Sequence, residues 1–246
     1  MSIIQLTSSR FLGGPERQIL GLADALTPRF ETHVVSFSEG GLCQSFLEEA
    51  TRRGISATQL QHDTPHLWRA VCELVNLIRA HSAEAVFCGG YKANLIGLIA
   101  ALRVGIPAVA VSRGWTGESR RVRIYERLDR VVHRWMHHVV CVSRGQAEKV
   151  LQAGVPSQRV SVIHNAIEPS RFSNPRPNLS SWRKYFDDNE VSQVVLAAGR
   201  LSPEKGFDVL IRAASQVCSK RADTGFVLFG DGVLGPELQR QIDEQG

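Results

Sequence analysis

Apolar and polar positions follow two patterns along this chain, and the patterns succeed each other from the first residues onward. Short apolar runs predict buried strands, because the strands of a parallel sheet are covered on both faces. Longer segments with an apolar residue at every third or fourth position predict amphipathic helices. We expect strands at residues 3–7, 33–37, 55–60, 85–88, 107–112, 139–142, 160–164, 194–198 and 226–229.

Helix-like segments lie between these strands, and several carry start or stop signals. Pro15 stands in a first helical turn, Ser143 precedes a helix as a cap, and Gly54 follows one. The alternation predicts an α/β fold with a doubly wound parallel sheet, whose ligands bind at the carboxyl ends of the strands. The helical segments are 19–26, 44–53, 67–78, 93–103, about 121–137, one that starts after 143, 181–186, 207–217 and 236–244.

Two domains are expected, because residues 165–178 are rich in Pro, Ser and Asn and have the composition of a connection. The first domain, 1–170, contains a complete Rossmann-like sheet. The second, 171–246, contains about two strands, which bury too little apolar surface for an independent domain. Either this second unit leans on the first domain or the chain is a fragment; we favour a fragment with an incomplete second Rossmann-like domain.

Composition narrows the class of protein. The chain has 246 residues, 43% hydrophobic and 22% charged, which is ordinary for a soluble α/β protein. It lacks a signal-peptide pattern, and its longest apolar stretch, 95–111, is interrupted by Arg103, Gly105 and Pro107. Its five cysteines form no CxxC pair and predict buried free thiols in a reducing compartment. We expect a cytoplasmic protein, and the net charge of +5 permits acidic ligands or an anionic membrane.

The most informative chemistry lies at residues 199–206, Gly-Arg-Leu-Ser-Pro-Glu-Lys-Gly, between a strand-like and a helix-like segment. Glycines let a ligand approach the backbone, the helix start supplies positive potential, and Arg200 and Lys205 supply two cations. This pattern favours a phosphate-rich ligand; a solvated loop with structural ion pairs is the alternative. Gly13 and Gly14 likewise precede a helix, where they face a ligand or only form a tight turn.

Four separated segments resemble, in order, the motifs of glycosyltransferase family 4, whose members have the GT-B fold. Residues 13–17, GGPER, resemble the family's GG-x-E loop after the first strand. Residues 142–143, 154–156 and 160–168 resemble its VS…GVP…VIxNGID stretch. Residues 199–206 match GRL-x-x-x-KG, and 230–232 match its GDG turn. The ordered set covers essentially the whole chain and identifies the fold as GT-B, cut short within the C-terminal domain.

The resemblance implies two Rossmann-like domains facing across a cleft, with the acceptor on the N-terminal side and a nucleotide sugar on the C-terminal side. It implies a retaining transfer without metal or other cofactor, in which the departing phosphate helps deprotonate the acceptor and nearby cations stabilise the growing charge. The implied catalytic residues are Arg200, Lys205 and Arg113; the donor diphosphate contacts are Gly13, Gly14, Arg200 and Lys205; and Asn165, Gly230 and Asp231 line the cleft.

The chain departs from the family pattern at two places. Many relatives carry a His-Gly pair near residues 113–114, where this chain has Arg113. An arginine cannot be a general base at neutral pH, although it could bind phosphate or a sugar hydroxyl. The family's two glutamates separated by seven residues are expected beyond Gly232, and the sequence does not contain them there.

The function expected is a retaining glycosyltransferase that moves a sugar from a UDP- or GDP-linked donor to a saccharide or lipid-linked acceptor, in polysaccharide or lipopolysaccharide biosynthesis. The truncated chain would have impaired activity. The alternatives are a non-catalytic remnant or binding module of a GT-B protein, and a GT-B epimerase or hydrolase of nucleotide sugars. The donor base, sugar, acceptor, linkage and oligomeric state stay open.

One helix-like segment suggests a further partner. Its arginines are expected to form a solvated face opposite an apolar core face; the alternative is peripheral contact with anionic lipid at the inner face of a membrane. The histidines have no metal-site pattern, and no nucleic-acid module is present. The arginines are Arg120, Arg123, Arg127, Arg130 and Arg134, and the apolar residues are Tyr125, Leu128, Val132 and Trp135.

Overall fold

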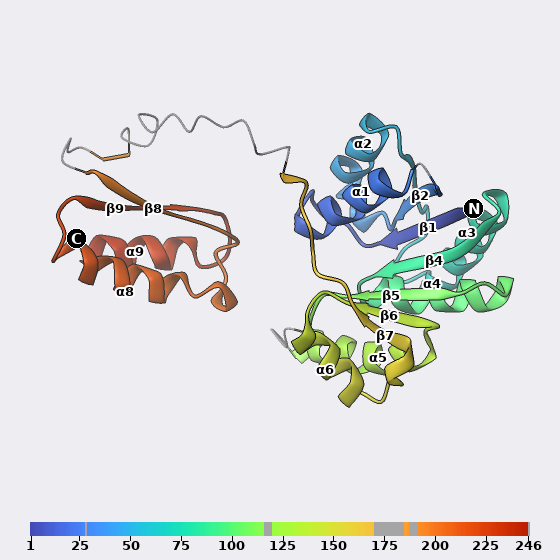
Figure 1. The fold of residues 1–246 in the computed structure, drawn as a ribbon. Helices are drawn as coiled ribbons and strands as arrows, with labels where there is room; N and C mark the ends of the chain where they lie inside the picture. Colours follow the sequence, from blue (N-terminus) through green and yellow to red (C-terminus); the bar gives the residue numbers. More distant parts are fainter. Residues whose placement is uncertain (28, 116–119, 170–184, 187–190, 246) are drawn as a thin grey trace. The chain divides into compact units, whose positions relative to one another are not determined.

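The computed structural model divides the chain into two compact units, Met1–Glu168 (unit 1) and Pro169–Gly246 (unit 2) (Figure 1). It describes residues 1–27, 29–115, 120–169, 185–186 and 191–245. The short helix expected at 181–186 lies largely outside the described residues. No helix in the described part of the chain is long and apolar enough to cross a membrane.

Unit 1 is a single parallel sheet of seven strands in the order β3-β2-β1-β4-β5-β6-β7, which confirms the expected α/β class (Figure 1). β1 lies in the middle, where Ile4 pairs with His33 of β2 and with Val86 of β4. The elements are β1 (Ser2–Thr7), α1 (Gly14–Leu26), β2 (Glu31–Ser36), η1 (Glu39–Gly41), α2 (Gln44–Arg52), β3 (Ser56–Gln59), α3 (Leu67–Ala80), β4 (Ala83–Gly89), α4 (Tyr91–Val104), β5 (Ala108–Ser112), α5 (Arg120–Trp135), β6 (His138–Cys141), α6 (Arg144–Gln152), η2 (Ser157–Arg159) and β7 (Val160–Val162).

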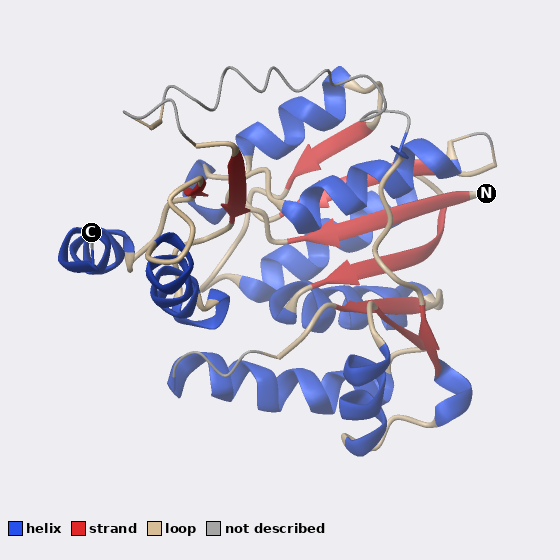
Figure 2. Cartoon of the chain, turned by 60° about the vertical axis from the view of Figure 1, so that its left-hand side comes forward, coloured by secondary structure: helices blue, strands red, loops and turns tan. Residues whose placement is uncertain are grey.

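Two hydrophobic clusters hold this sheet, one on each face, and the strands lie between helices in Figure 2. The smaller cluster joins α1 and α2 to β2, through residues such as Leu20, Val34 and Phe46. The larger cluster joins α3 through α6 to the strands, with Leu74, Ile96 and Val150 among its members. Burial on both faces explains why these strands are apolar throughout, as parallel strands usually are.

Strands β5 and β6 are covered less completely. In β5, Ala108, Ala110 and Ser112 are buried, whereas Val109 and Val111, which point to the other face, are only half-buried. The same alternation continues in β6. The face of these strands that lies away from α4 through α6 is therefore not fully buried by the described residues.

Unit 2 is much smaller and contains one sheet of two parallel strands, in which Val195 pairs with Phe226. Its core consists of Phe207, Ile211 and Leu238, with a few half-buried neighbours. This confirms the expectation of an incomplete second domain. Its elements are β8 (Gln193–Ala198), η4 (Pro203–Lys205), α8 (Phe207–Cys218), β9 (Thr224–Phe229) and α9 (Gly235–Gln245).

Helix α5 corrects the expected orientation of its faces. Tyr125, Leu128 and Trp135 were expected to face the core, and all three are exposed. Of the expected apolar face only Val132 is buried. The polar residues Glu126, Asp129 and His133 are buried in their place. Glu126 and Asp129 accept hydrogen bonds from other elements, whereas His133 Nδ1 bonds to the carbonyl of Asp129 in the same helix.

The cysteines are all free, as expected, but they are not all buried. Cys43, Cys88 and Cys141 are buried, and burial raises the pKa of the Cys141 thiol to about 11. Cys72 is exposed on α3, which corrects the expectation for that residue.

Candidate functional site

The loops that carry the predicted site residues of unit 1 leave the carboxyl ends of its strands. Gly13 and Gly14 follow β1, Arg113 follows β5, and Asn165 follows β7. Since all seven strands are parallel, these loops emerge at one edge of the sheet. The fold therefore gathers residues that are up to 152 positions apart in the sequence (165 minus 13).

The Gly13–Gly14 loop is held by the first turn of α1. The N–H of Gly13 donates to Glu16 Oε2 at 3.0 Å, and the buried Glu16 closes this turn from below. A Cβ atom on Gly13 would lie 2.6 Å from the ring of Phe11, so a side chain here would require that exposed ring to move. A Cβ atom on Gly14 would meet nothing within 4 Å, so its backbone borders open space that a ligand could use.

Arg113, in the loop after β5, interacts with residues at or after the ends of two other strands of the sheet. Its guanidinium lies against the end of β4, where a Cβ atom on Gly89 would come within 2.7 Å of Arg113 Nη1. Burial lowers the pKa of Arg113, while the carboxylate of Glu16 opposes that shift. Arginine nevertheless stays protonated at neutral pH. The structure thus places a positive charge within electrostatic reach of Glu16, whose carboxylate accepts the N–H of Gly13.

A small cavity of about 140 Å³ adjoins Arg113, and Tyr91, Asn94, Trp115 and Asp129 line it among others. Asp129 accepts hydrogen bonds from Trp115 Nε1 at 2.9 Å and from Asn94 Nδ2 at 2.7 Å. These bonds join α4, α5 and the loop after β5 behind Arg113. The buried network therefore fixes the segment that presents the arginine, a role that the sequence pattern did not reveal.

The loop that contains Asn165 is fixed to α1. Gln18 uses both ends of its amide, because Nε2 donates to the carbonyl of Ala166 at 2.9 Å and Oε1 accepts from its N–H at 3.3 Å. Asn165 itself is exposed, next to this pair. Gln18 is a positioning residue that the sequence analysis missed, since its partner lies 148 positions away.

A second group missed by the sequence analysis ties together the loops after β2 and β3. Lys92, at the start of α4, bonds to Glu39 and to Asp63 Oδ1, the latter at 2.6 Å, and its ammonium lies 4.4 Å from the centre of the Phe37 ring. Hydrogen bonds from Lys92 and from the N–H groups of Thr64 and Glu39 hold the pKa of Asp63 below its usual value, against the opposing effect of burial. Glu39, Asp63 and Lys92 lie 24 to 53 positions apart in the sequence, so no local pattern indicated this cluster.

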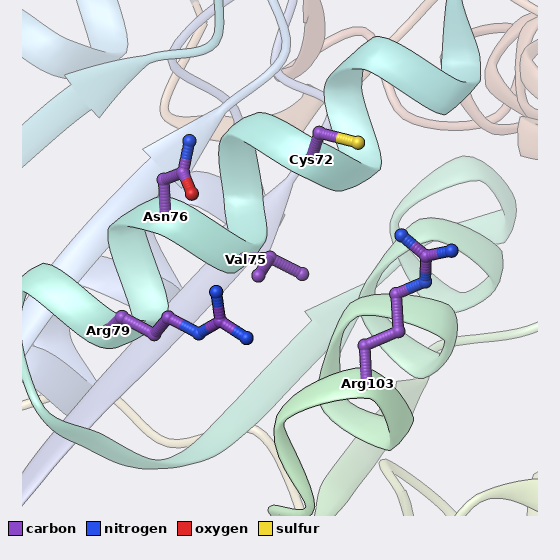
Figure 3. A pocket seen from close by; sticks show the side chains of 5 residues that line it. All are labelled: Cys72, Val75, Asn76, Arg79 and Arg103. Carbon is purple, nitrogen blue, oxygen red and sulfur yellow. The ribbon is translucent and has the colours of Figure 1, made fainter.

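A larger depression, of about 370 Å³, lies between α3 and α4 (Figure 3). It is lined by Cys72, Val75, Asn76, Arg79 and Arg103. The two arginines belong to the last turns of their helices, and none of the predicted site residues borders the depression. We therefore do not assign the site to it.

In unit 2, the loop at 199–206 connects β8 to α8, as expected. Gly206 has a φ of 65°, in the left-handed region that favours glycine, and it is the residue before the first turn of α8. Gly199 lies against the ring of Phe207, where a Cβ atom would come within 3.2 Å of the ring. The backbone thus favours glycine at 206, whereas a side chain at 199 would require the Phe207 ring to shift by a few tenths of an ångström.

The GDG turn packs directly on this loop. The N–H of Leu201 donates to the carbonyl of Asp231 at 2.8 Å, and the N–H of Leu234 donates to the carbonyl of Leu201 at 3.0 Å. A Cβ atom on Gly230 would lie 2.0 Å from the carbonyl oxygen of Gly199, and one on Gly232 would lie 2.4 Å from that of Leu201. The two motifs of unit 2 are therefore parts of one backbone arrangement that only glycine permits.

The two predicted cations of this loop differ in their surroundings. Arg200 Nη2 donates to Glu204 Oε1 at 2.6 Å, and hydrogen bonds from Ser202 and Arg200 lower the pKa of the Glu204 carboxyl to about 2. Lys205 is exposed, and within the described residues its ammonium has no hydrogen bond or salt bridge. The expected alternative, a structural ion pair, holds for Arg200, whereas Lys205 remains open to a ligand.

Within the described ranges, no group of three or more His, Cys, Asp or Glu side chains is arranged to hold a metal ion. The chemistry offered by the two glycine loops is therefore that of backbone N–H groups, two arginines and a lysine. Such groups bind phosphate and stabilise negative charge.

Comparison with known proteins places these features in a family. The profile of glycosyltransferase family 4 matches residues 12–171. The GPI3 subunit of phosphatidylinositol N-acetylglucosaminyltransferase from Saccharomyces cerevisiae is 27% identical over 173 residues, 70% of this chain and 36% of that protein. The UDP-Gal:α-D-GlcNAc-diphosphoundecaprenol α-1,3-galactosyltransferase of Escherichia coli is 24% identical over 180 residues, 70% of this chain and 46% of that protein. The chain thus spans less than half the length of these two relatives.

Solved structures agree on the fold. Anabaena HepE in complex with UDP-glucose superposes with a TM-score of 0.80 and 23% identity, over 100% of this chain and 66% of that one. The UDP-GlcNAc 2-epimerase of Neisseria meningitidis, bound to UDP-GlcNAc, superposes with a TM-score of 0.65 and 15% identity, over 100% of this chain and 69% of that one. At these identities the likeness establishes the GT-B fold and leaves the reaction open.

Proposed function

The chain belongs to glycosyltransferase family 4, and we propose that it is the greater part of a retaining glycosyltransferase that uses a nucleotide-sugar donor. The donor would be linked to UDP or GDP, and the acceptor would be a saccharide or a lipid-linked saccharide. The observation that carries this proposal is the loop at 199–206, in which glycine-only contacts with the GDG turn present Arg200 and Lys205. A rigid backbone with two cations is suited to a diphosphate.

Arg200 and Lys205 would hold the donor diphosphate, and Gly13 and Gly14 would let it approach the backbone of unit 1. As the bond between sugar and phosphate breaks, negative charge grows on the diphosphate, and cations already in place lower the energy of that state. One preorganised donor of this kind contributes about 2.7–4 kcal/mol to transition-state stabilisation in well-studied enzymes. Asn165, Gly230 and Asp231 would line the same cleft.

The ion pair of Arg200 would have to open when a donor binds. In the structure, the Arg200 guanidinium donates to Glu204 Oε1, and the Ser202 hydroxyl donates to the same oxygen. A bound diphosphate would replace this carboxylate as the partner of Arg200, since phosphate oxygens also accept two parallel N–H bonds from arginine. Glu204 would thus hold Arg200 in place until the donor arrives.

Arg113 would act on the unit 1 side. It stays charged, so it cannot take the proton from the acceptor hydroxyl. It can bind a phosphate or sugar oxygen, and its place at the end of β4, within electrostatic reach of Glu16 in the first turn of α1, suits that role. We propose that the departing phosphate takes the proton and that neither a metal nor another cofactor takes part.

The compartment and partners form the finer part of the proposal. A protein that uses nucleotide sugars would act in the cytoplasm, and a lipid-linked acceptor would bring it to the inner face of the membrane. Support comes from the relatives whose names include phosphatidylinositol and diphosphoundecaprenol. Synthesis of a polysaccharide or lipopolysaccharide would be the corresponding process.

A specific observation favours one alternative reaction. The fold is shared with a nucleotide-sugar epimerase, so a GT-B epimerase or hydrolase would use the same diphosphate loop without an acceptor. Incubation with UDP- and GDP-sugars, with and without saccharide acceptors, separates the reactions. Label in a larger saccharide supports transfer, whereas an isomerised or free sugar without acceptor supports the alternative.

The test of the diphosphate loop is calorimetric titration of UDP and GDP into the chain and its variants. Arg200→Ala and Lys205→Ala should each weaken nucleotide affinity by about tenfold or more, because each removes a charge-assisted contact. The matched control is Arg212→Ala with Lys220→Ala, which removes two exposed cations of α8 and its following turn. Equal affinities in all four proteins would refute the assignment of the loop.

A further inference from the structure

Helix α5 presents a continuous apolar face to solvent. Ile124, Leu128, Val131 and Trp135 are 57%, 57%, 50% and 68% exposed, respectively. Their spacing of four, three and four residues places them along one side of an α-helix. Single exposed apolar residues are ordinary, but four in one row form a patch that typically has a partner.

The orientation of α5 is imposed by its other side. Glu126, Asp129 and His133 precede Leu128, Val131 and Trp135 by two residues each, and they are buried at 3%, 3% and 0% exposure. Two residues correspond to about 200° of rotation, so the row that begins at Glu126 points away from the row that begins at Ile124. Hydrogen bonds from Asn94 and Trp115 to Asp129 fix the polar side inward. Turning the helix to hide the apolar row would break these bonds.

The charges on the helix have one sign on the side that water reaches. Its sequence contains two acidic residues, Glu126 and Asp129, and both are buried. The exposed charged side chains described on α5 are all arginines, and they flank the apolar row. They are Arg120, Arg123, Arg127 and Arg134.

We propose that this outer face of α5 docks on an anionic lipid surface. Ile124, Leu128 and Val131 would enter the boundary between headgroups and acyl chains, Trp135 would lie at the interface, and the arginines would pair with lipid phosphates. The charged side chains that α5 exposes have one sign, and a bilayer of anionic lipid presents the opposite sign over a wide surface. The face would hold the transferase beside a lipid-linked acceptor.

Docking of α5 on a membrane rests on the proposed function for its lipid-linked acceptor, but it requires neither catalysis nor nucleotide binding. Vesicle binding with no nucleotide affinity would leave the docking face standing and count against the transferase. Nucleotide affinity without vesicle binding would support the transferase and count against the docking face.

The experiment is flotation of the chain with vesicles of phosphatidylcholine alone or mixed with phosphatidylglycerol, in low salt. The chain should float with the mixed vesicles only, and salt should release it, because counterions screen charges over a shorter distance as their concentration rises. The double variant Leu128→Ser with Trp135→Ser should reduce the bound fraction by about tenfold. Tryptophan emission should shift to shorter wavelength on binding, and Trp135→Phe should abolish most of that shift.

Matched variants separate this face from general stickiness. Leu42→Ser with Leu102→Ser removes two apolar side chains that are 48% and 59% exposed elsewhere, and it should float like the unaltered chain. Arg120→Gln with Arg127→Gln should weaken binding, whereas Arg69→Gln with Arg159→Gln, with the same loss of charge, should not. Circular dichroism checks that every variant keeps its fold.

Three results would overturn the proposal. The first is that the chain does not float with anionic vesicles in low salt. The second is that Leu128→Ser with Trp135→Ser floats as well as the unaltered chain. The third is a dimer in light scattering that Leu128→Ser dissociates while vesicle binding is unchanged, because the face would then belong to a second copy.

Discussion

Both units place a glycine-bounded loop between a parallel strand and a helix, but they hold that loop in different ways. In unit 1 the loop after β1 rests on a central strand, and hydrophobic clusters cover both faces of the sheet. In unit 2 the loop after β8 follows one of only two strands, and the single cluster there is built on Phe207, Ile211 and Leu238. Because this core is small, backbone contacts with the GDG turn hold the loop in place.

This difference shows that a sequence can specify the local geometry of a binding loop without specifying a large hydrophobic core around it. The loop of unit 2 has its local geometry because glycine permits close approach of two backbone segments. Its strand β8 is poorly covered, as the exposure of both Val195 and Leu196 shows, although it belongs to a parallel pair. We therefore expect the loop to have a well-defined backbone geometry although the free energy of unfolding of unit 2 is small.

The largest expected effect is in amide hydrogen exchange. Amides of β1 and β4 should exchange only on global unfolding, at about 5–15 kcal/mol, because they lie in the middle of the buried sheet. Amides of β8 and β9 should exchange at several kcal/mol less, since a two-stranded sheet buries little apolar surface. Mass spectrometry of peptides from the whole chain measures both. Equal protection in the two units would break the comparison.

Truncation of one leucine in each unit should give the next largest difference. Leu74→Ala, at a fully buried position in unit 1, should lower the free energy of unfolding by about 2–5 kcal/mol, from lost burial and the cavity left behind. Leu196→Ala, at a position 47% exposed in unit 2, should cost less than about 1 kcal/mol. Urea unfolding followed by circular dichroism checks the first variant and local hydrogen exchange the second. A Leu196 effect as large as that of Leu74 would mean that unit 2 has a real core.

A pair of glycine substitutions sharpens the comparison of the two loops. Gly230→Ala places a Cβ atom 2.0 Å from the carbonyl oxygen of Gly199, so the GDG turn must move and unit 2 should lose about 2 kcal/mol. Gly14→Ala meets open space in the first turn of a helix and should stabilise unit 1 by about 0.4–1 kcal/mol.

The same pair tests ligand approach. Gly14→Ala should weaken nucleotide-sugar binding despite the gain in stability, because a methyl group would occupy the space next to the backbone. Calorimetric titration and thermal unfolding of each variant give the two quantities. Unchanged affinity in Gly14→Ala would show that Gly14 serves only the turn before α1 and does not face the ligand.

The smallest expected difference is in acid sensitivity. Burial, with a smaller effect of His81, lowers the pKa of His33 to about 4, so the folded state favours its neutral form. The resulting stability is complete above the unfolded pKa of about 6.5 and is lost as the pH falls toward 4, by about 1–2 kcal/mol once solvent screening is allowed for. Glu204 has its pKa lowered to about 2, so its contribution to unit 2 declines only as the pH falls below about 4.5.

Urea unfolding between pH 7 and pH 4 therefore separates the units, with unit 1 weakening first. His33→Gln should flatten that dependence, whereas His66→Gln, at an exposed position, should leave it unchanged. A histidine resonance of His33 that titrates near pH 6.5 would contradict the assignment.

Much of the architecture could be predicted from the sequence. All nine strands occur at the expected places within a few residues, because apolar runs bounded by glycine, proline and polar turns are local signals. The glycine loops could be predicted too, since glycine is needed wherever backbones approach closely. Which loop lies beside which was not readable. Gln18 bonds to a residue 148 positions away, and no local pattern records such a partner.

Helix α5 shows where the reading from pattern fails. The rule that apolar residues face inward would bury Leu128 and Trp135, and the structure exposes both. It buries Asp129 because Asn94 and Trp115, from other elements, satisfy its carboxylate. Such long-range satisfaction outweighs helical periodicity.

The sequence by itself determined the alternation of strands and helices, the two glycine loops and the membership of a family, because each depends on residues that are neighbours along the chain. The tertiary structure alone decided which side of α5 meets water, that Arg200 is paired while Lys205 is exposed, and that Arg113 lies against Gly89 at the end of β4. Burial and pairing depend on atoms from distant elements, so only the folded chain specifies them.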